Sequence, residues 1–300
     1  MSDWIISIEG TEAGHTAAML LALLAAFLHA VFGSLQKGRI DPWLSRGAID
    51  TAQVIISLPL ALFLVPWPQG TEWLLILGAL PIHFTYKLGM ALAYSRGAFT
   101  VVYPVVRGMG PVFTVFAAWI VFGEVFTLTQ WFGVIVLLMG IFGLALYNLV
   151  TIEVARETLV PALWLAAGTG GLVALYTTYD AYAIRATPDP FTFLAWFFVI
   201  CSVDMPILAA LRWRRMSDRP DPVHLARLGI TGALIAFGSF GSVMLATRLD
   251  KVGEAAVLRE TSTVFAALIG WLILKETVGP RRIALMTLIA LGAVIVEVGG

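Results

Sequence analysis

The stretch VVYPVVRGMGPVFTVFAAW, residues 101–119, places one charged side chain, Arg107, inside a run that otherwise suits hydrocarbon. A membrane helix needs about 20 mostly apolar residues, and the stretch belongs to such a segment at 98–122. A charge at the centre of a membrane helix costs about 2.5–3.5 kcal/mol, so it usually faces a cavity or a partner within the protein. Because Pro104 and Pro111 flank the arginine, we expect the helix to be broken there, as part of a polar notch in a cavity wall. For the prolines alone, a kink that serves helix packing is the alternative.

The composition of the whole chain is that of a membrane protein. Of its 300 residues, 59% are hydrophobic and only 13% are charged, whereas a soluble domain has about 25% charged residues. The formal net charge is zero, so we expect no nucleic-acid partner. A single cysteine, Cys201, excludes an intrachain disulfide and provides no metal-binding spacing. We therefore expect the lipid bilayer as a partner, and neither a metal nor a cofactor.

Segments with the length and apolar character of a membrane helix recur along the chain, separated by short connections with turn residues. We place them at 16–36, 48–66, 73–95, 98–122, 129–149, 161–184, 190–211, 225–247, 253–275 and 280–298. The predicted fold class is therefore an all-α, multi-pass membrane protein with ten transmembrane helices, located in the cell inner membrane.

The two halves of the chain resemble each other. A shift of 152 residues superposes rare residue types on their own kind: Arg96 on Arg248, Arg107 on Arg259, Trp119 on Trp271, Glu124 on Glu276 and Gly140 on Gly292. We therefore predict two five-helix repeats, at 1–150 and 151–300. Because five is odd, the second repeat must run through the membrane upside down relative to the first. Inverted repeats are typical of secondary transporters, which bind substrate near the midplane where the halves meet.

Each half also ends in a similar pattern of residues. The first contains PVFTVFAAWIVFGE followed by GVIVLLMGI, and the second contains TVFAALIGWLILKET followed by ALMTLIALGA. In this pattern the chain resembles the drug/metabolite transporter superfamily and, within it, the EamA domain. The resemblance covers nearly the whole chain. It implies two inverted EamA-like repeats around a central cavity, and transport without ATP. In agreement, the sequence has no P-loop pattern.

Three basic residues fall at a similar predicted depth in the membrane. Arg107 lies about nine residues into its segment, roughly 13 Å from its start, and Arg259 is its repeat partner. Lys87 lies near the same depth on the preceding segment. We predict that the two arginines face one cavity and bind a carboxylate or phosphate of the substrate, with Lys87 adding charge, because the guanidinium fork binds such groups bidentately. The alternative is that each basic residue is paired with Asp or Glu and joins helices.

Other polar residues within the predicted helices are further candidates. Four could contact the substrate through hydrogen bonds or aromatic stacking: Tyr103, His83, Tyr86 and Tyr179. Four could take up protons and couple transport to the proton gradient: His29, Glu260, Asp180 and Asp204. Ordinary helix packing is the alternative for each of them.

Charges in the connections bear on orientation. Those after odd-numbered segments hold Lys37, Arg39, Arg46, Arg96, Arg156, Arg212, Arg214, Arg215, Arg219, Arg227, Lys275, Arg281 and Arg282, whereas those after even-numbered segments hold Arg185, Arg248 and Lys251. The positive-inside rule then puts both termini outside. The family resemblance implies the opposite, with both termini in the cytoplasm.

The function predicted from these features is secondary transport. We expect a small polar metabolite with an anionic group, such as an amino acid or organic acid, to be carried by alternating access, with export the commoner role in the family and protons a candidate coupling ion. The chain would act as a monomer or homodimer. The alternative is a flippase for a lipid-linked or amphipathic anion. An intramembrane enzyme has less support. Tyr179 and Asp180 form the YD pair found in intramembrane aspartyl proteases, but the GxGD motif that such an enzyme also needs is absent from the sequence, and so is HExxH.

Overall fold

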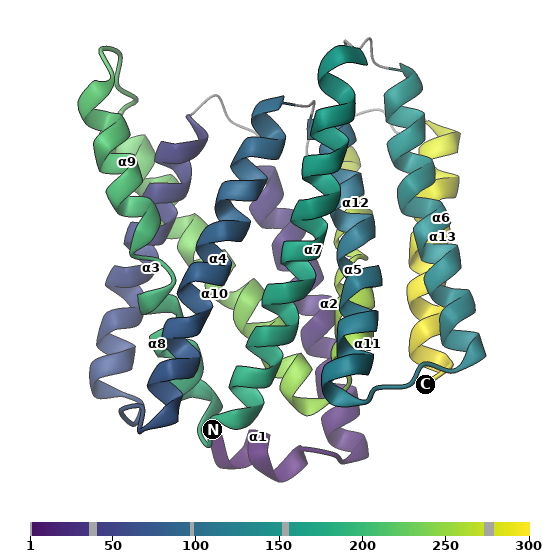
Figure 1. Ribbon diagram of the computed structural model, residues 1–300, viewed down its shortest axis with the longest axis horizontal. Coiled ribbons are helices and arrows are strands. Elements are labelled where there is room, and N and C mark those ends of the chain that lie inside the picture. The colour runs from purple at the N-terminus through teal and green to yellow at the C-terminus, as the bar shows by residue number, and fades with distance from the viewer. Residues whose placement is uncertain (1, 36–40, 97–98, 152–155, 273–278) are drawn as a thin grey trace.

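The computed structural model describes residues 2–35, 41–96, 99–151, 156–272 and 279–300, and this part of the chain is helical without a strand (Figure 1). In chain order the helices are α1 (Ser2–Ile8), α2 (Glu12–Leu35), α3 (Pro42–Phe63), α4 (Thr71–Arg96), α5 (Phe99–Phe122), α6 (Leu128–Thr151), α7 (Arg156–Ala186), α8 (Pro190–Ile200), α9 (Asp204–Arg215), α10 (Pro222–Leu249), α11 (Val252–Arg259), α12 (Ser262–Leu272) and α13 (Pro280–Val298). Most of them stand side by side as a bundle, and the short α1 lies across one end.

The prediction of an all-α membrane protein is confirmed. Within the described residues, eight segments are long and apolar enough to cross a membrane. Two of the eight are composite, since α8 and α9 form one of them and α11 and α12 form another. Two further helices, α7 and α13, have 31 and 19 residues but do not meet the same measure of composition. The predicted count of ten spans is therefore not confirmed by length and composition.

Helix breaks occur at other places than we expected. The predicted break around Arg107 is wrong, because α5 runs uninterrupted from Phe99 to Phe122. Prolines also lie inside α3, α4 and α7, and membrane helices tolerate them where neighbouring helices surround the freed backbone groups. The breaks lie instead between α8 and α9, and between α11 and α12 directly after Arg259. Each break leaves backbone carbonyls inside the bundle without a continuing helix to pair with.

Helix packing is symmetric under exchange of the two halves. Helix α2 packs against α10 as its repeat partner α7 packs against α4, and α2 contacts α11 and α12 as α7 contacts α5. Helix α3 contacts α10 as α8 contacts α4, whereas α5 with α11 and α6 with α13 pack against their own equivalents. In Figure 1, α5 descends while α11 and α12 ascend. Two copies of one unit in opposite orientations produce this arrangement.

Glycines bring the helices of the two halves close together. A Cβ atom on Gly292 of α13 would lie 2.4 Å from the backbone nitrogen of Leu137 and 2.6 Å from the carbonyl oxygen of Gly133, both on α6. A Cβ on Gly170 of α7 would lie 2.6 Å from the Cβ of Met109 on α5. Small residues at these crossings let helix backbones touch, which is how membrane helices associate without a hydrophobic driving force.

Candidate functional site

Arg107 and Arg259 meet at the centre of the bundle. Arg107 lies in the middle of α5 and Arg259 is the last residue of α11, and their exposed fractions are 6% and 5%. The break after α11 leaves the carbonyl of Arg259 without a helical partner, and the Nη2 of Arg107 donates to it at 3.4 Å. The same nitrogen donates to the hydroxyl of Ser262. The two repeat-related arginines are therefore neighbours, and the side chain of Arg107 binds the backbone of Arg259 rather than its side chain.

Arg107 is ion-paired. Its Nε lies 3.0 Å from Oε2 of Glu260, the residue after Arg259, and Glu260 is only 1% exposed. Within a membrane protein such a pair leaves little free charge on either partner, and breaking it would leave an uncompensated buried charge. For Arg107, the contacts therefore match the alternative of a helix-joining ion pair.

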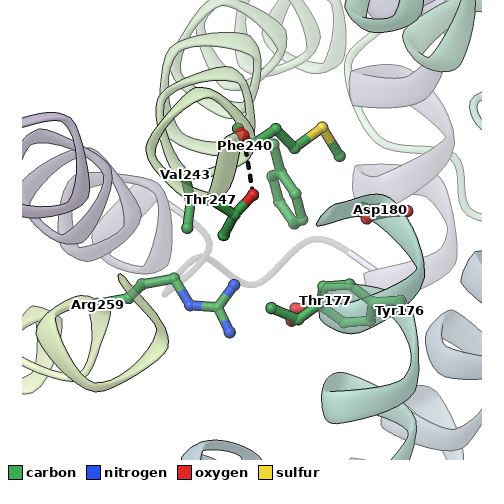
Figure 2. A pocket seen from close by; sticks show the side chains of 8 residues that line it. Tyr176, Thr177, Asp180, Phe240, Val243, Thr247 and Arg259 are labelled. Atoms are coloured by element: carbon green, nitrogen blue, oxygen red, sulfur yellow. Dashed lines mark hydrogen bonds between the residues drawn. The ribbon is translucent and has the colours of Figure 1, made fainter. Parts of the chain in front are cut away.

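Arg259 is arranged differently. Its guanidinium projects from α11 into a narrow pocket toward Thr177 and Tyr176 on α7, and α10 forms a further wall of this pocket (Figure 2). Among the described residues, no carboxylate lies within ion-pairing distance of it, and its buried Nε has no hydrogen-bond partner. The pocket is lined by Tyr176, Thr177, Asp180, Phe240, Val243, Met244, Thr247 and Arg259. The pocket is therefore small, and Arg259 gives one of its walls a positive charge.

The opposite wall of the pocket carries a carboxylate. Asp180 is 3% exposed, and its Oδ2 lies 2.8 Å from Nε2 of His83 on α4. Its other oxygen, Oδ1, is buried and has no hydrogen-bond partner in the described part of the chain. Buried polar atoms are rarely left unpaired in native proteins, so the free donor of Arg259 and the free acceptor of Asp180 call for water or a ligand. In this conformation the pocket has room for about one water molecule.

Two of the residues predicted to contact the substrate, His83 and Tyr86, pack against a residue in the pocket wall. The rings of His83 and Tyr86 each lie 4.8 Å, centroid to centroid, from the ring of Tyr176, which lines the pocket. His29 on α2 is half-buried and lies close enough to both arginines to interact with their charge.

The remaining predicted residues lie elsewhere. The hydroxyl of Tyr179 donates to the carbonyl of Leu75 at 2.9 Å, so this tyrosine packs α7 onto α4. Lys87 does not join the arginines: it binds Asp204 and Asp50 at the break between α8 and α9. The side chain of Tyr103 lies outside the described residues.

The sequence analysis missed several lining residues. Phe240, Val243, Met244 and Thr247 are spaced i, i+3, i+4 and i+7, which puts them on one face of α10. That spacing was readable from the sequence, but nothing in it marked this face of α10 rather than another.

Two inverted halves are typical of a membrane transporter, and the charged pocket of this chain is lined by α7, α10 and α11 of the second half. The sequence profile described as "EamA-like transporter family" matches residues 16–146 and again residues 160–298, and the chain belongs to this family of transporters. A solved structure titled "Crystal structure of protein" has the same fold, with a TM-score of 0.72, 20% sequence identity, and coverage of 93% of this chain and 97% of that one. No curated protein matches the chain.

Proposed function

We propose that the protein is a secondary transporter of a small polar metabolite with a carboxylate group, and that Arg259 binds that carboxylate. The observation that carries the proposal is a buried guanidinium that faces a pocket and has no carboxylate partner among the described residues. A cation in such surroundings is costly unless it is paired. An anionic substrate supplies the partner, and the planar fork of arginine suits a carboxylate.

The second charge in the pocket narrows the substrate class. The free Oδ1 of Asp180 can accept a hydrogen bond from an ammonium group while Arg259 holds the carboxylate. Thr177 and Thr247 offer hydroxyl groups, and the ring of Phe240 offers an apolar surface. A zwitterion of the amino-acid type satisfies both unpaired groups, whereas a plain organic acid satisfies only the arginine. We therefore favour an amino acid over an organic acid.

Transport requires a larger space than the pocket has here. Room for about one water is too small for an amino acid, so this conformation is a closed one in the proposed cycle. The walls come from α7 and α10 on one side and α11 on the other, and separation of these helices toward either face would admit substrate from that face. We propose export across the inner membrane as the direction.

Counterflow in liposomes tests the proposal. Liposomes containing the purified protein are loaded with a mixture of unlabelled amino acids, and the entry of labelled amino acids is measured. We expect exchange by the wild type and a loss of about tenfold or more in Arg259→Gln, because a charge-assisted hydrogen bond contributes about 1.5–3 kcal/mol. The matched control is Arg214→Gln, at an exposed position at the end of α9, which should exchange normally.

Two results would contradict the proposal. Wild-type exchange of organic acids but not amino acids would reject the role of Asp180. Wild-type rates in Arg259→Gln would reject the role of the arginine.

A further inference from the structure

The break between α8 and α9 holds a buried charged cluster that the pocket does not use. The Nζ of Lys87, on α4, donates to Oδ2 of Asp50 on α3 at 2.8 Å and to Oδ1 of Asp204 on α9 at 2.8 Å. It also donates to the carbonyl oxygen of Cys201, at 2.6 Å. Lys87 is 8% exposed and Asp50 is fully buried. One ammonium group therefore joins three separate segments inside the bundle.

The surroundings of this ammonium are those of a cation site. Cys201 caps α8, so its carbonyl lies at the negative end of that helix and has no continuing helix to pair with. Together with the two carboxylates it directs three oxygen atoms at one point. In transporters, unwound backbone and the ends of broken helices hold the coupling cation in this way. In this structure the ammonium group of Lys87 occupies the point at which the three oxygen atoms are directed.

The charges around Lys87 balance only while it is protonated. Arg46 on α3 lies 2.9 Å, Nε to Oδ1, from Asp50, so two cations face two carboxylates. The other ionisable groups nearby in the described part of the chain are the thiol of Cys201, the phenol of Tyr86, and the pair of His83 and Asp180 one helical turn away. Loss of one proton from the lysine leaves a net negative charge in the interior. The cluster must then open to water or take up another cation.

We propose that this Lys87 cluster is the coupling site of the transporter and that Lys87 carries the coupled proton; this inference rests on the proposed transport function. In the releasing step, an N–H bond of the ammonium breaks and its electron pair stays on Nζ. The proton passes along the existing 2.8 Å hydrogen bond to Oδ1 of Asp204, and from there to water on one side of the membrane. The neutral amine is then protonated from the other side.

In this proposal, the protonation of Lys87 also determines whether α9 is held against α3 and α4. With a proton on Lys87, α9 is held to α3 and α4 by the two ion pairs. Without it, the attraction for Asp204 is lost and α9 is free to separate at the α8–α9 break. Arg107 and Arg259 cannot serve this purpose, because a guanidinium does not give up its proton in proteins.

The variant Lys87→Arg tests the proposal in liposomes. Arginine keeps the positive charge and the donors but does not release a proton. We expect counterflow of labelled amino acids to persist, and accumulation driven by an imposed pH gradient to fall to the level measured without a gradient. Wild-type accumulation in Lys87→Arg would overturn the proposal. Absence of counterflow in the wild type would instead count against the proposed function.

A second measurement needs no substrate. Removal of the side chain in Lys87→Ala should leave an oxygen-lined site for a small cation, so NaCl or LiCl should raise its melting temperature by several degrees over choline chloride. The wild type, whose own ammonium fills the site, should show no such difference. The double variant Lys87→Ala/Asp50→Asn should lose the effect. Equal melting temperatures of Lys87→Ala in all three salts would overturn the proposal, and if this variant does not fold, the comparison with Lys87→Arg decides.

Discussion

At the residue scale, the two repeat-related arginines differ in their contacts. Arg107 is held by Glu260, whereas Arg259 has no carboxylate partner in the described part of the chain and faces the pocket. The sequence placed both arginines at the same depth and predicted one shared role for them. Which of the two is paired depends on the direction in which Glu260 points after the helix break, and no residue pattern specifies that direction.

The ion pair of Arg107 should be needed for stability. Arg107→Ala leaves the carboxylate of Glu260 buried without a partner, so we expect the free energy of unfolding to fall by about 3–5 kcal/mol. Removal of both charges in Arg107→Met/Glu260→Gln should restore most of the loss, because no unpaired charge remains. The measurement is unfolding in mixed detergent micelles. Equal stability of the single and double variants would show that the pair does not join α5 to the α11–α12 break.

At the scale of helices, the breaks and the close crossings determine where polar groups and backbones meet. Hydropathy and length identify eight of the predicted segments, whereas α7 and α13 do not meet the same measure. The sequence misplaced the break in the fourth segment, because Pro104 and Pro111 suggested one where α5 is continuous. The break after Arg259 contains no proline or glycine, only Glu260 and Thr261. It is stabilised by tertiary contacts such as the bond from Arg107, which a local pattern cannot reveal.

The crossing of α6 and α13 should tolerate no side chain larger than hydrogen at Gly292. The methyl group of Gly292→Ala would meet the backbone of α6, so we expect the free energy of unfolding to fall by about 1–3 kcal/mol as the helices move apart. Gly241→Ala on α10 is the matched control, since a Cβ there meets no atom within 4 Å. Thermal unfolding of the purified variants checks this, and equal melting temperatures would argue against a tight crossing.

At the scale of the whole molecule, exchange symmetry would give the proposed transporter a simple route to alternating access. Because each half packs against the other through equivalent helices, an exchange of the two halves' conformations would convert a pocket open to one face into a pocket open to the other. Both chain ends lie at one end of the bundle, while α9 ends at the other with Arg212, Arg214 and Arg215 in its last turn (Figure 1). The charge distribution therefore differs between the two ends.

Orientation follows from this difference by the positive-inside rule. We expect the end that contains the last turn of α9 to be cytoplasmic and the C-terminus to lie outside. A C-terminal fusion to alkaline phosphatase should be active and one to green fluorescent protein dark, with the opposite result for fusions in the α9–α10 connection. A fluorescent C-terminal fusion would instead place both termini in the cytoplasm, as the family resemblance implies.

The carboxylate of Glu260 has no counterpart in the first half of the chain. The shift of 152 residues that superposes the arginines puts Gly108 opposite it, and a Cβ at Gly108 would already lie 3.0 Å from the ring of Phe142. An acidic side chain at position 108 would therefore require the ring of Phe142 to move, whereas position 260 already holds one. Glu260 therefore makes the surroundings of the two arginines unequal: Arg107 pairs with it, whereas Arg259 faces the pocket.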